Sequence, residues 1–392
     1  MKFAGKLLFI LVAVALASGA ALDPVPGRIT DRYDTEKGSI QVETIATGLQ
    51  FPWSVAFLPD GTALVTEKPG RLRHVSGHKL SAPIKGVPNV HYDRQGGLLE
   101  VAVDPDFAQN SIIFLTYAEP DETGTISGTA VARARLVLDD NPRLEDLKVI
   151  FSLPKKSELS VHFGSRIVFA DDGTMFITIG DRYISEEKGI GMRAQDPFDP
   201  AGSVIRLNRD GSIPVDNPFA DGKKAHPAIW SIGHRNPQGA VWNKATKSLW
   251  TVAHAARGGD EINHPEAGKN YGWPIITYGI NYNGEKIGIG THKEGMEQPV
   301  YYWDPSIAPS GMVWYDGAAF PDWQGNLLVG ALKDEMIVRL ELKDGKVVHE
   351  ERLLATKYGR IRDVRQGPDG YLYFVTDERK GKLYRVSPAA TD

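Results

Sequence analysis

The chain has 392 residues, of which 24% are charged, and a formal net charge of −4. This mildly acidic balance argues against nucleic acid and anionic membrane surfaces as partners. Because the chain contains no cysteine, it has neither disulfides nor thiolate chemistry, and a core, with or without a metal, must stabilise it.

The N-terminus has the layout of a secretory signal peptide, which we predict over residues 1–22. Lys2 and Lys6 precede the apolar run LLFILVAVALA, and small residues follow it. The run is too short for a membrane anchor, so we expect a periplasmic or secreted protein with no membrane span in its mature form. A buried N-terminal helix is the alternative. Residues 23–38 are polar and contain Pro and Gly, which predicts a flexible lead-in.

A pattern of apolar strand, turn and apolar strand then recurs six times, at residues 55–75, 98–118, 166–179, 239–255, 311–332 and 362–386. Copies of strand hairpins at spacings of roughly 45 to 75 residues are typical of β-propellers, in which each copy forms the inner strands of one blade. We therefore predict an all-β fold with few helices: a six-bladed β-propeller that forms a single domain over residues 39–392. The uneven spacing predicts long insertions, where function usually sits, at residues 184–201, 210–227 and 258–305.

A two-sheet sandwich is the alternative fold. It does not predict the nearly identical Pro-Asp-Gly turns at residues 59–61 and 368–370, one toward each end of the chain. A further β-rich run, residues 40–46, precedes the first copy. We expect this run to close the last blade together with the C-terminal strands.

The third copy contains a candidate acid–base pair. Its runs SRIVFA and TMFITI flank a turn of sequence DDG, which is a hairpin signal. Residues paired across such a ladder have numbers that sum to about 344–346, so His162 lies opposite Asp181 to within one residue. A carboxylate fixes the tautomer of a neighbouring histidine and stabilises its imidazolium, as a general base requires. The alternative is a surface or structural histidine.

Polar residues stand at like positions relative to the strands of successive copies: Gln95, His162, Arg235 with Asn236, Lys333, and Arg360 with Arg362. In a propeller, like positions converge on one rim of the central channel. Guanidinium groups bind carboxylates through paired hydrogen bonds, so we predict a rim that binds something polyanionic. The alternative for any single member is solvated surface, and for Arg235 a structural tie to loop carbonyls.

Residues 258–274, GGDEINHPEAGKNYGWP, carry a different signal. Asp260 and Glu261 precede a loop rich in Gly, Asn and Pro, and carboxylate and carbonyl oxygens are the ligands that Ca²⁺ takes. The spacing is not that of an EF-hand. No HExxH motif or spaced His/Cys cluster indicates a transition metal, and GxSxG, Walker A and GxGxxG motifs are absent.

The chain resembles the soluble quinoprotein aldose sugar dehydrogenases of the glucose/sorbosone dehydrogenase family. The likeness runs from about residue 48 to residue 386 and is carried by QGGLLEVAVDPDF, the HxGxRIVF hairpin ending in IGD, GHRNPQG, GGDEIN with NYGWP, and GRIRDV. The family binds pyrroloquinoline quinone (PQQ) and Ca²⁺ on a six-bladed propeller. The resemblance implies an enzyme that oxidises aldose sugars at C1 to lactones by hydride transfer to PQQ and passes the electrons to an external acceptor, a soluble carrier or dye.

By this resemblance, His162 is the general base and Asp181 its partner. The residues implied to hold or contact PQQ are Gln95, Arg235, Asn236, Tyr282, Lys333, Arg360 and Arg362.

The resemblance also implies two metal sites. Glu261 and the carbonyl of Tyr271 look like the ligands of a structural Ca²⁺. The backbone carbonyls of Ala255 and Ala256 correspond to those that bind the catalytic Ca²⁺, at a place where the family typically has a Gly-Pro pair.

Two alternatives come from other functional classes. A Ca²⁺-dependent lactonase-type hydrolase on the same propeller would require several Asp, Asn or Glu side chains around the axis, whereas the inferred rim is mostly basic. A non-catalytic propeller that binds a partner is favoured only by the presence of Ala255 and Ala256 where the family typically has a Gly-Pro pair.

Overall fold

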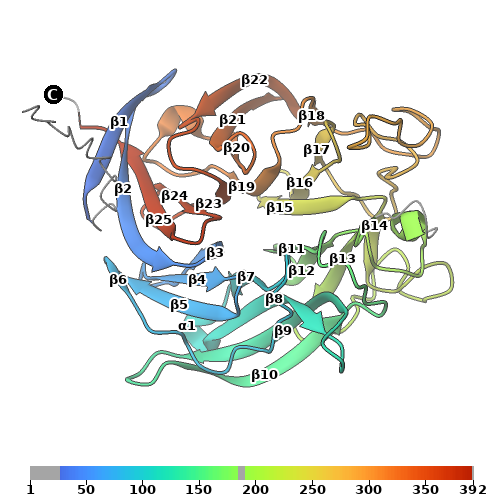
Figure 1. The fold of residues 1–392 in the computed structure, drawn as a ribbon, viewed down its shortest axis with the longest axis horizontal. Helices are drawn as coiled ribbons and strands as arrows, with labels where there is room; N and C mark the ends of the chain where they lie inside the picture. Colours follow the sequence, from blue (N-terminus) through green and yellow to red (C-terminus); the bar gives the residue numbers. More distant parts are fainter. Residues whose placement is uncertain (1–26, 184–189, 391–392) are drawn as a thin grey trace, which may run out of the picture.

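The computed structural model describes residues 27–183 and 190–390. Six antiparallel sheets stand around a central axis and form a six-bladed propeller, as predicted (Figure 1). The described helical segments are short: α1 (Phe107–Asn110) and the 3₁₀ turns η2 (Ile190–Gln195) and η3 (Pro321–Trp323). Within these two ranges, no helix is long and apolar enough to cross a membrane. The predicted signal peptide, residues 1–22, lies outside the described residues.

Each sheet is one blade, with its first strand nearest the axis and its last strand at the outer edge. Blade 1 contains β3 (Pro52–Phe57), β4 (Ala63–Glu67), β5 (Arg71–Ser76) and β6 (Lys79–Leu80). Blade 2 contains β7 (Leu98–Val103), β8 (Ile112–Pro120), β9 (Ser127–Val137) and β10 (Arg143–Ser152). Blade 3 contains β11 (Gly164–Phe169), β12 (Thr174–Ile179), β13 (Ser203–Asn208) and β14 (Ile229–Ile232).

The second half of the ring follows the same plan. Blade 4 contains β15 (Asn236–Asn243), β16 (Ser248–His254), β17 (Asp260–Asn263) and β18 (Tyr301–Trp303). Blade 5 contains β19 (Pro309–Trp314), β20 (Leu327–Ala331), β21 (Met336–Lys343) and β22 (Lys346–Leu353). Blade 6 contains β23 (Ile361–Gln366), β24 (Leu372–Thr376), β25 (Gly381–Pro388), β2 (Gly38–Leu49) and β1 (Ile29–Thr35).

Apolar side chains are packed between neighbouring blades. Every residue of β12, TMFITI, is buried, because both faces of this strand are covered. A typical inter-blade cluster joins Leu328 of blade 5 to Val364 and Phe374 of blade 6. The six inner strands contact one another in sequence, and β23 contacts β3, so the ring is closed.

The N-terminal strand completes the last blade, which confirms the expectation for residues 40–46. Strand β2 pairs antiparallel with β25, with Ile40 opposite Pro388 and Glu43 opposite Arg385. Figure 1 shows β1 and β2 at the outer edge of the blade that also holds the C-terminal strands. The ring is therefore held shut by backbone hydrogen bonds between the two ends of the chain.

Part of the predicted flexible lead-in is ordered, and that part of the prediction is wrong. Residues 29–35 form β1, which pairs with β2 so that Tyr33 lies opposite Ile40. The polar composition of residues 29–35 gave no strand signal, because the side-chain contacts that stabilise β1 are with the rest of the propeller. Tyr33 packs edge-on against Tyr358, with 6.1 Å between the centroids of the two aromatic rings. The predicted insertion at residues 258–305 also contains two strands, β17 and β18.

The inner strands carry a buried ionic network. Arg166 on β11 forms salt bridges with Glu100 on β7, at 2.5 Å, and with Asp363 on β23, at 2.9 Å. The same guanidinium lies 4.3 Å from the ring centroid of Trp53 on β3. Arg365 approaches both acids, at 2.7 and 3.0 Å. The network ties blades 2, 3 and 6 to one another beneath the polar rim.

Candidate active site

The polar residues predicted from the sequence gather where the first strand of each blade begins and the second strand ends. Gln95 precedes β7, His162 precedes β11 and Arg235 precedes β15, while Asp181 follows β12. Strands in an antiparallel blade alternate in direction, so the start of the first and the end of the second lie on one face of the ring. The structure thus places these four predicted residues on a common rim.

His162 and Asp181 form a buried pair. The His162 Nδ1 atom lies 2.7 Å from Asp181 Oδ1, and both side chains are almost fully buried. The other carboxylate oxygen accepts a hydrogen bond of 2.8 Å from the indole nitrogen of Trp273. The backbone N–H of Tyr183 also donates to Asp181 Oδ1, at 2.9 Å. With its carboxylate fixed by these donors, Asp181 orients the imidazole.

Burial and a neighbouring cation control the protonation of the pair. Burial lowers the pKa of His162, the charge of Arg235 lowers it further, and Asp181 only partly opposes both effects. Burial alone would raise the pKa of Asp181, but the charge and hydrogen bond of His162 hold it below its usual value. His162 is therefore neutral near pH 7 and can accept a proton on Nε2.

Two predicted amide side chains hold the histidine loop in place. Gln95 Oε1 accepts a hydrogen bond of 2.9 Å from the backbone N–H of His162. Asn236 Oδ1 accepts one of 3.1 Å from Gly164. His162 itself has a φ of 54°, in the left-handed region. These bonds from two other blades help to hold it in a conformation that a side chain rarely adopts.

Arg235 spans the rim toward blade 4. Its side chain is buried and donates to the backbone carbonyls of His254, at 3.2 Å, and of Ala255. The guanidinium also lies 5.2 Å from the ring centroid of Trp273. The structural tie to loop carbonyls, considered from the sequence, is therefore present in this structure.

Arg362 and Arg360 surround a second carboxylate, Asp377. Arg362 donates to Asp377 at 2.5 Å and to Gln238 Oε1 at 2.6 Å. Lys68 lies 3.2 Å from the same carboxylate, and Arg360 lies 4.0 Å from it. Three cations thus share one acid. Burial would raise the pKa of Asp377, but these cations lower it to about 2.

Sequence reasoning missed Lys68 and Asp377, although the sequence contained a signal for both. Lys68 follows β4 as Lys333 follows β20, and Asp377 follows FVT as Asp181 follows ITIG. Trp273 was also missed, because only the folded loop brings it against Asp181.

Two predicted cofactor residues are more exposed than the others. The Lys333 side chain is 56% exposed and donates to the carbonyl of Ser306 at 2.7 Å. Tyr282 is 67% exposed. The structure therefore does not bury Tyr282 with His162 and the cations. It belongs to a loop whose residue Ile280 bridges to Arg257, next to the Ala255-Ala256 segment.

The proposed carbonyl ligands Ala255 and Ala256 lie at the rim, and both residues are buried. The carbonyl of Ala255 already accepts a hydrogen bond from Arg235, so a metal would compete with this guanidinium for it. The Ala255 N–H donates to Asp260 Oδ1 at 2.9 Å. The other Asp260 oxygen accepts three hydrogen bonds from residues 306–308, so this carboxylate stabilises the loop.

Glu261 on β17 offers a better environment for a hard cation. Burial, and then the charge of Asp260, raise the pKa of Glu261 to about 7, although a hydrogen bond from Asn263 opposes them. The Asn263 Oδ1 atom is buried and has no hydrogen-bond partner among the described residues. The unpartnered Asn263 oxygen lies close to the Glu261 carboxylate, whose charged form is disfavoured by burial. A Ca²⁺ ion would satisfy both groups. Tyr271 is buried in the loop that follows, with its ring stacked on His234 at 4.7 Å. No group of three or more His, Cys, Asp or Glu that could hold a metal occurs in the described ranges.

The donors at the rim fit an anionic group. Arg362 Nε is a buried donor without a hydrogen-bond partner among the residues described. Burial, followed by the charges of Arg362 and Arg235, keeps the pKa of His254 well below its usual value. Cations outnumber carboxylates here, so a ligand with several carboxylates would complete the hydrogen bonds and offset the charge.

Comparison with known proteins assigns the chain to a family. The profile described as Glucose / Sorbosone dehydrogenase matches residues 49–385. The chain belongs to this family. It is 46% identical over 354 residues to the aldose sugar dehydrogenase YliI of Escherichia coli (strain K12), covering 89% of this chain and 93% of that protein.

Solved structures of family members have the same fold. The apo form of the soluble aldose sugar dehydrogenase from Escherichia coli matches with a TM-score of 0.84 and 45% identity, over 89% of this chain and 100% of that one. The PQQ-bound form of an aldose sugar dehydrogenase from Streptomyces coelicolor matches with a TM-score of 0.72 and 26% identity, over 91% of this chain and 99% of that one.

Proposed function

We propose that the protein is a PQQ-dependent dehydrogenase that oxidises aldose sugars at C1 to lactones. The observation that carries the proposal is the buried His162–Asp181 pair beside a rim where cations outnumber carboxylates. The relatives named as aldose sugar dehydrogenases, one of them in a PQQ-bound form, support it.

His162 acts as the general base in this proposal. Asp181 holds the Nδ1–H, so Nε2 is free to take the proton of the anomeric hydroxyl. Asp181 then stabilises the imidazolium, and Trp273 keeps the carboxylate in position. PQQ, when bound, supplies the carbon that accepts the hydride from C1.

The cofactor would be held by the residues on the rim. Those that we assign to it are Gln95, Arg235, Asn236, Tyr282, Lys333, Arg360 and Arg362, together with Lys68. Their side chains offer several guanidinium and ammonium donors, which suits a ligand with carboxylates and quinone oxygens. The electrons would leave to an external acceptor. We also infer export to the periplasm or medium, from the N-terminal sequence.

We propose Ca²⁺ at two places. Glu261 and the Tyr271 carbonyl would hold a structural ion, supported by the unpartnered Asn263 oxygen. A second ion would take the carbonyls of Ala255 and Ala256 once Arg235 releases the first of them. Because a carboxylate of the cofactor would compete for Arg235, binding of metal and cofactor should reinforce each other.

The structural ion predicts a calcium-dependent melting temperature. Ca²⁺ should raise the melting temperature of the apoprotein, and Glu261→Gln should abolish most of that rise because the only ionisable ligand becomes neutral. Differential scanning calorimetry with and without chelator measures it, with the exposed Glu294→Gln as the matched control. An equal rise in both variants would rule out the Glu261 site.

The decisive experiment is a PQQ titration of the full chain with Ca²⁺, followed by absorption with and without glucose. Glucose-dependent bleaching of the quinone band and reduction of a dye support the proposal. Arg362→Ala should weaken PQQ binding about tenfold or more, since it removes a charge-assisted hydrogen bond. The exposed Arg352→Ala on β22 is the control. Ca²⁺-dependent ester cleavage would instead indicate a lactonase, and the absence of both activities a binding protein.

The lactonase alternative is less well supported by the contacts at the rim. Asp181 is engaged by His162 and Trp273, and Asp377 by Arg362 and Lys68. Neither carboxylate is free to take part in an axial Ca²⁺ site.

A further inference from the structure

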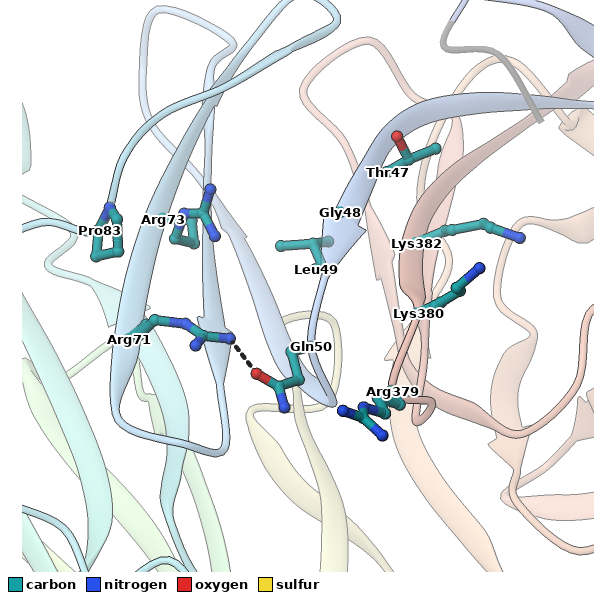
Figure 2. A pocket seen from close by; sticks show the side chains of 10 residues that line it. All are labelled: Thr47, Gly48, Leu49, Gln50, Arg71, Arg73, Pro83, Arg379, Lys380 and Lys382. Carbon is teal, nitrogen blue, oxygen red and sulfur yellow. Dashed lines mark hydrogen bonds between the residues drawn. The ribbon is translucent and has the colours of Figure 1, made fainter. Parts of the chain in front are cut away.

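A groove lined by basic residues lies between blades 1 and 6. It has a volume of about 660 Å³ and is lined by Arg71 and Arg73 of β5 on one side and by Arg379, Lys380 and Lys382 on the other. Figure 2 shows these two sets on either side of the segment Thr47–Gln50. We call this feature, defined by its five basic side chains, the cationic groove.

The positive charge of the cationic groove is not balanced by its lining, which includes no acidic residue. Glu67, fully buried, bonds Arg71 at 2.8 Å and Arg73 at 3.1 Å, so one carboxylate serves two arginines. Arg379 and Lys382 form no salt bridge within the described part of the chain. The groove therefore keeps an excess of positive charge on a protein whose formal net charge is −4.

The cationic groove adjoins the candidate active site. Phe51 follows Gln50, which lines the groove. The Lys68 ammonium lies over the Phe51 ring, 5.1 Å from the ring centroid. The Phe51 N–H donates to the carbonyl of Glu378 at 2.7 Å. The segment that follows β24 contributes Asp377 to the rim and, two residues later, Arg379 to the groove. The two sites thus share the same pair of backbone segments.

We propose that the cationic groove docks the acidic face of a one-electron carrier protein. The proposal rests on the proposed function, in which one aldose gives a lactone, two electrons and two protons. Two carrier molecules would each take one electron, and the protons would pass to solvent. An acidic partner is repelled by most of a net negative surface and attracted here, so the local charge orients it beside the cofactor.

The test uses the full chain loaded with PQQ and Ca²⁺, saturating glucose and three acceptors: an acidic c-type cytochrome, a basic c-type cytochrome and the small dye phenazine methosulfate. The charge-reversal variant is Arg379→Glu/Lys382→Glu. The matched control, Lys244→Glu/Lys346→Glu, makes the same charge change at two exposed positions, the β15–β16 turn and the start of β22, at the opposite end of blades 4 and 5.

We expect the Arg379→Glu/Lys382→Glu variant to lower kcat/KM for the acidic cytochrome about tenfold or more, with dye reduction within twofold of wild type. The control variant should stay within twofold on every acceptor. Added salt should slow the wild type with the acidic cytochrome toward the rate of the variant. Equal rates for the variant and wild type with the acidic cytochrome, or equal losses in both double variants, would overturn the docking site. Loss of glucose-dependent dye reduction in the wild type would refute the proposed function itself.

Discussion

His162 combines burial with a neighbouring cation, and both disfavour its imidazolium form. As the proposed general base, His162 is therefore ready to accept a proton without first having to lose one. Asp181 favours the charged form that proton transfer creates and so partly opposes both effects.

Removing the base should reveal its share of the rate. His162→Ala should lower glucose-dependent dye reduction by about 10²- to 10⁴-fold, the usual contribution of a general base. PQQ binding, measured by absorption, should stay within a few-fold because the cations remain. His349→Ala, at an exposed position on β22, is the control. A variant with near-wild-type turnover would show that another group takes the proton.

The electrostatic effect of Arg235 on His162 can be measured in the apoprotein. The guanidinium charge disfavours protonation of the imidazole, so Arg235→Gln should raise the pKa of His162 and move its titration midpoint to higher pH. NMR of ¹⁵N-labelled histidine follows the midpoint directly. Arg257→Gln, an exposed arginine of the neighbouring segment, should leave it unchanged. An unchanged midpoint in Arg235→Gln would mean that the charge of Arg235 does not contribute to the pKa of His162.

At the scale of elements, the inner strands depend on charged side chains as well as on apolar packing. Arg166 links Glu100 on β7 to Asp363 on β23. Arg166→Ala would leave both carboxylates partly unpaired in a buried site. We expect a loss of about 3–5 kcal/mol in the free energy of unfolding, as for other broken buried ion pairs.

Chemical denaturation would measure this loss. Arg352→Ala removes an arginine whose side chain is 53% exposed on β22, and it should change the free energy by less than about 1 kcal/mol. If Arg166→Ala were as stable as this control, the network would contribute specificity but little stability.

The hairpin of β11 and β12 shows how far sequence reasoning reaches. The DDG turn fixes the register, and Ile167 pairs with Ile177 as the counting predicts. A bulge between Gly164 and Ile167 then shifts the register by one residue, and this shift places His162 opposite Asp181. Short-range turn chemistry therefore located the pair to within one residue, and the bulge supplies the remaining shift.

Contacts between blades were beyond such reasoning. Trp273 reaches Asp181 from a loop of another blade, and no local pattern specifies that approach. The ordered strand β1 was missed because its sequence is polar and its side-chain contacts with the ring, such as Tyr33 with Tyr358, lie far away in the sequence. The convergence of the rim cations could be predicted, because it follows from the repeated strand pattern alone.

At the scale of the whole molecule, β1 and β2 make unequal contributions to the ring. Strand β2 hydrogen-bonds to β25, whereas β1 lies outside β2 at the edge of the blade. A chain that begins at Gly38 should therefore keep a closed ring and bind PQQ, with a modestly lower melting temperature.

A chain that begins at Phe51 should behave differently, since it lacks β2 and exposes the edge of β25. Unpaired edges favour association with other chains, so we expect aggregation or loss of the monomer. Size-exclusion chromatography and PQQ titration of the two truncated chains would distinguish them. A monomeric, PQQ-binding chain that begins at Phe51 would show that the β2–β25 pairing is dispensable.

The pairing of Ile40 with Pro388 also dictates the order in which the molecule can form. Joining segments so far apart costs chain entropy of about 5 kcal/mol by the logarithmic dependence on loop length. Strand β2 is synthesised early but cannot pair until β25, the last strand, has been made. Five blades can assemble from neighbouring hairpins while the sixth stays incomplete. Because the ring cannot close before its final strand has been synthesised, we expect closure to be the last step of folding.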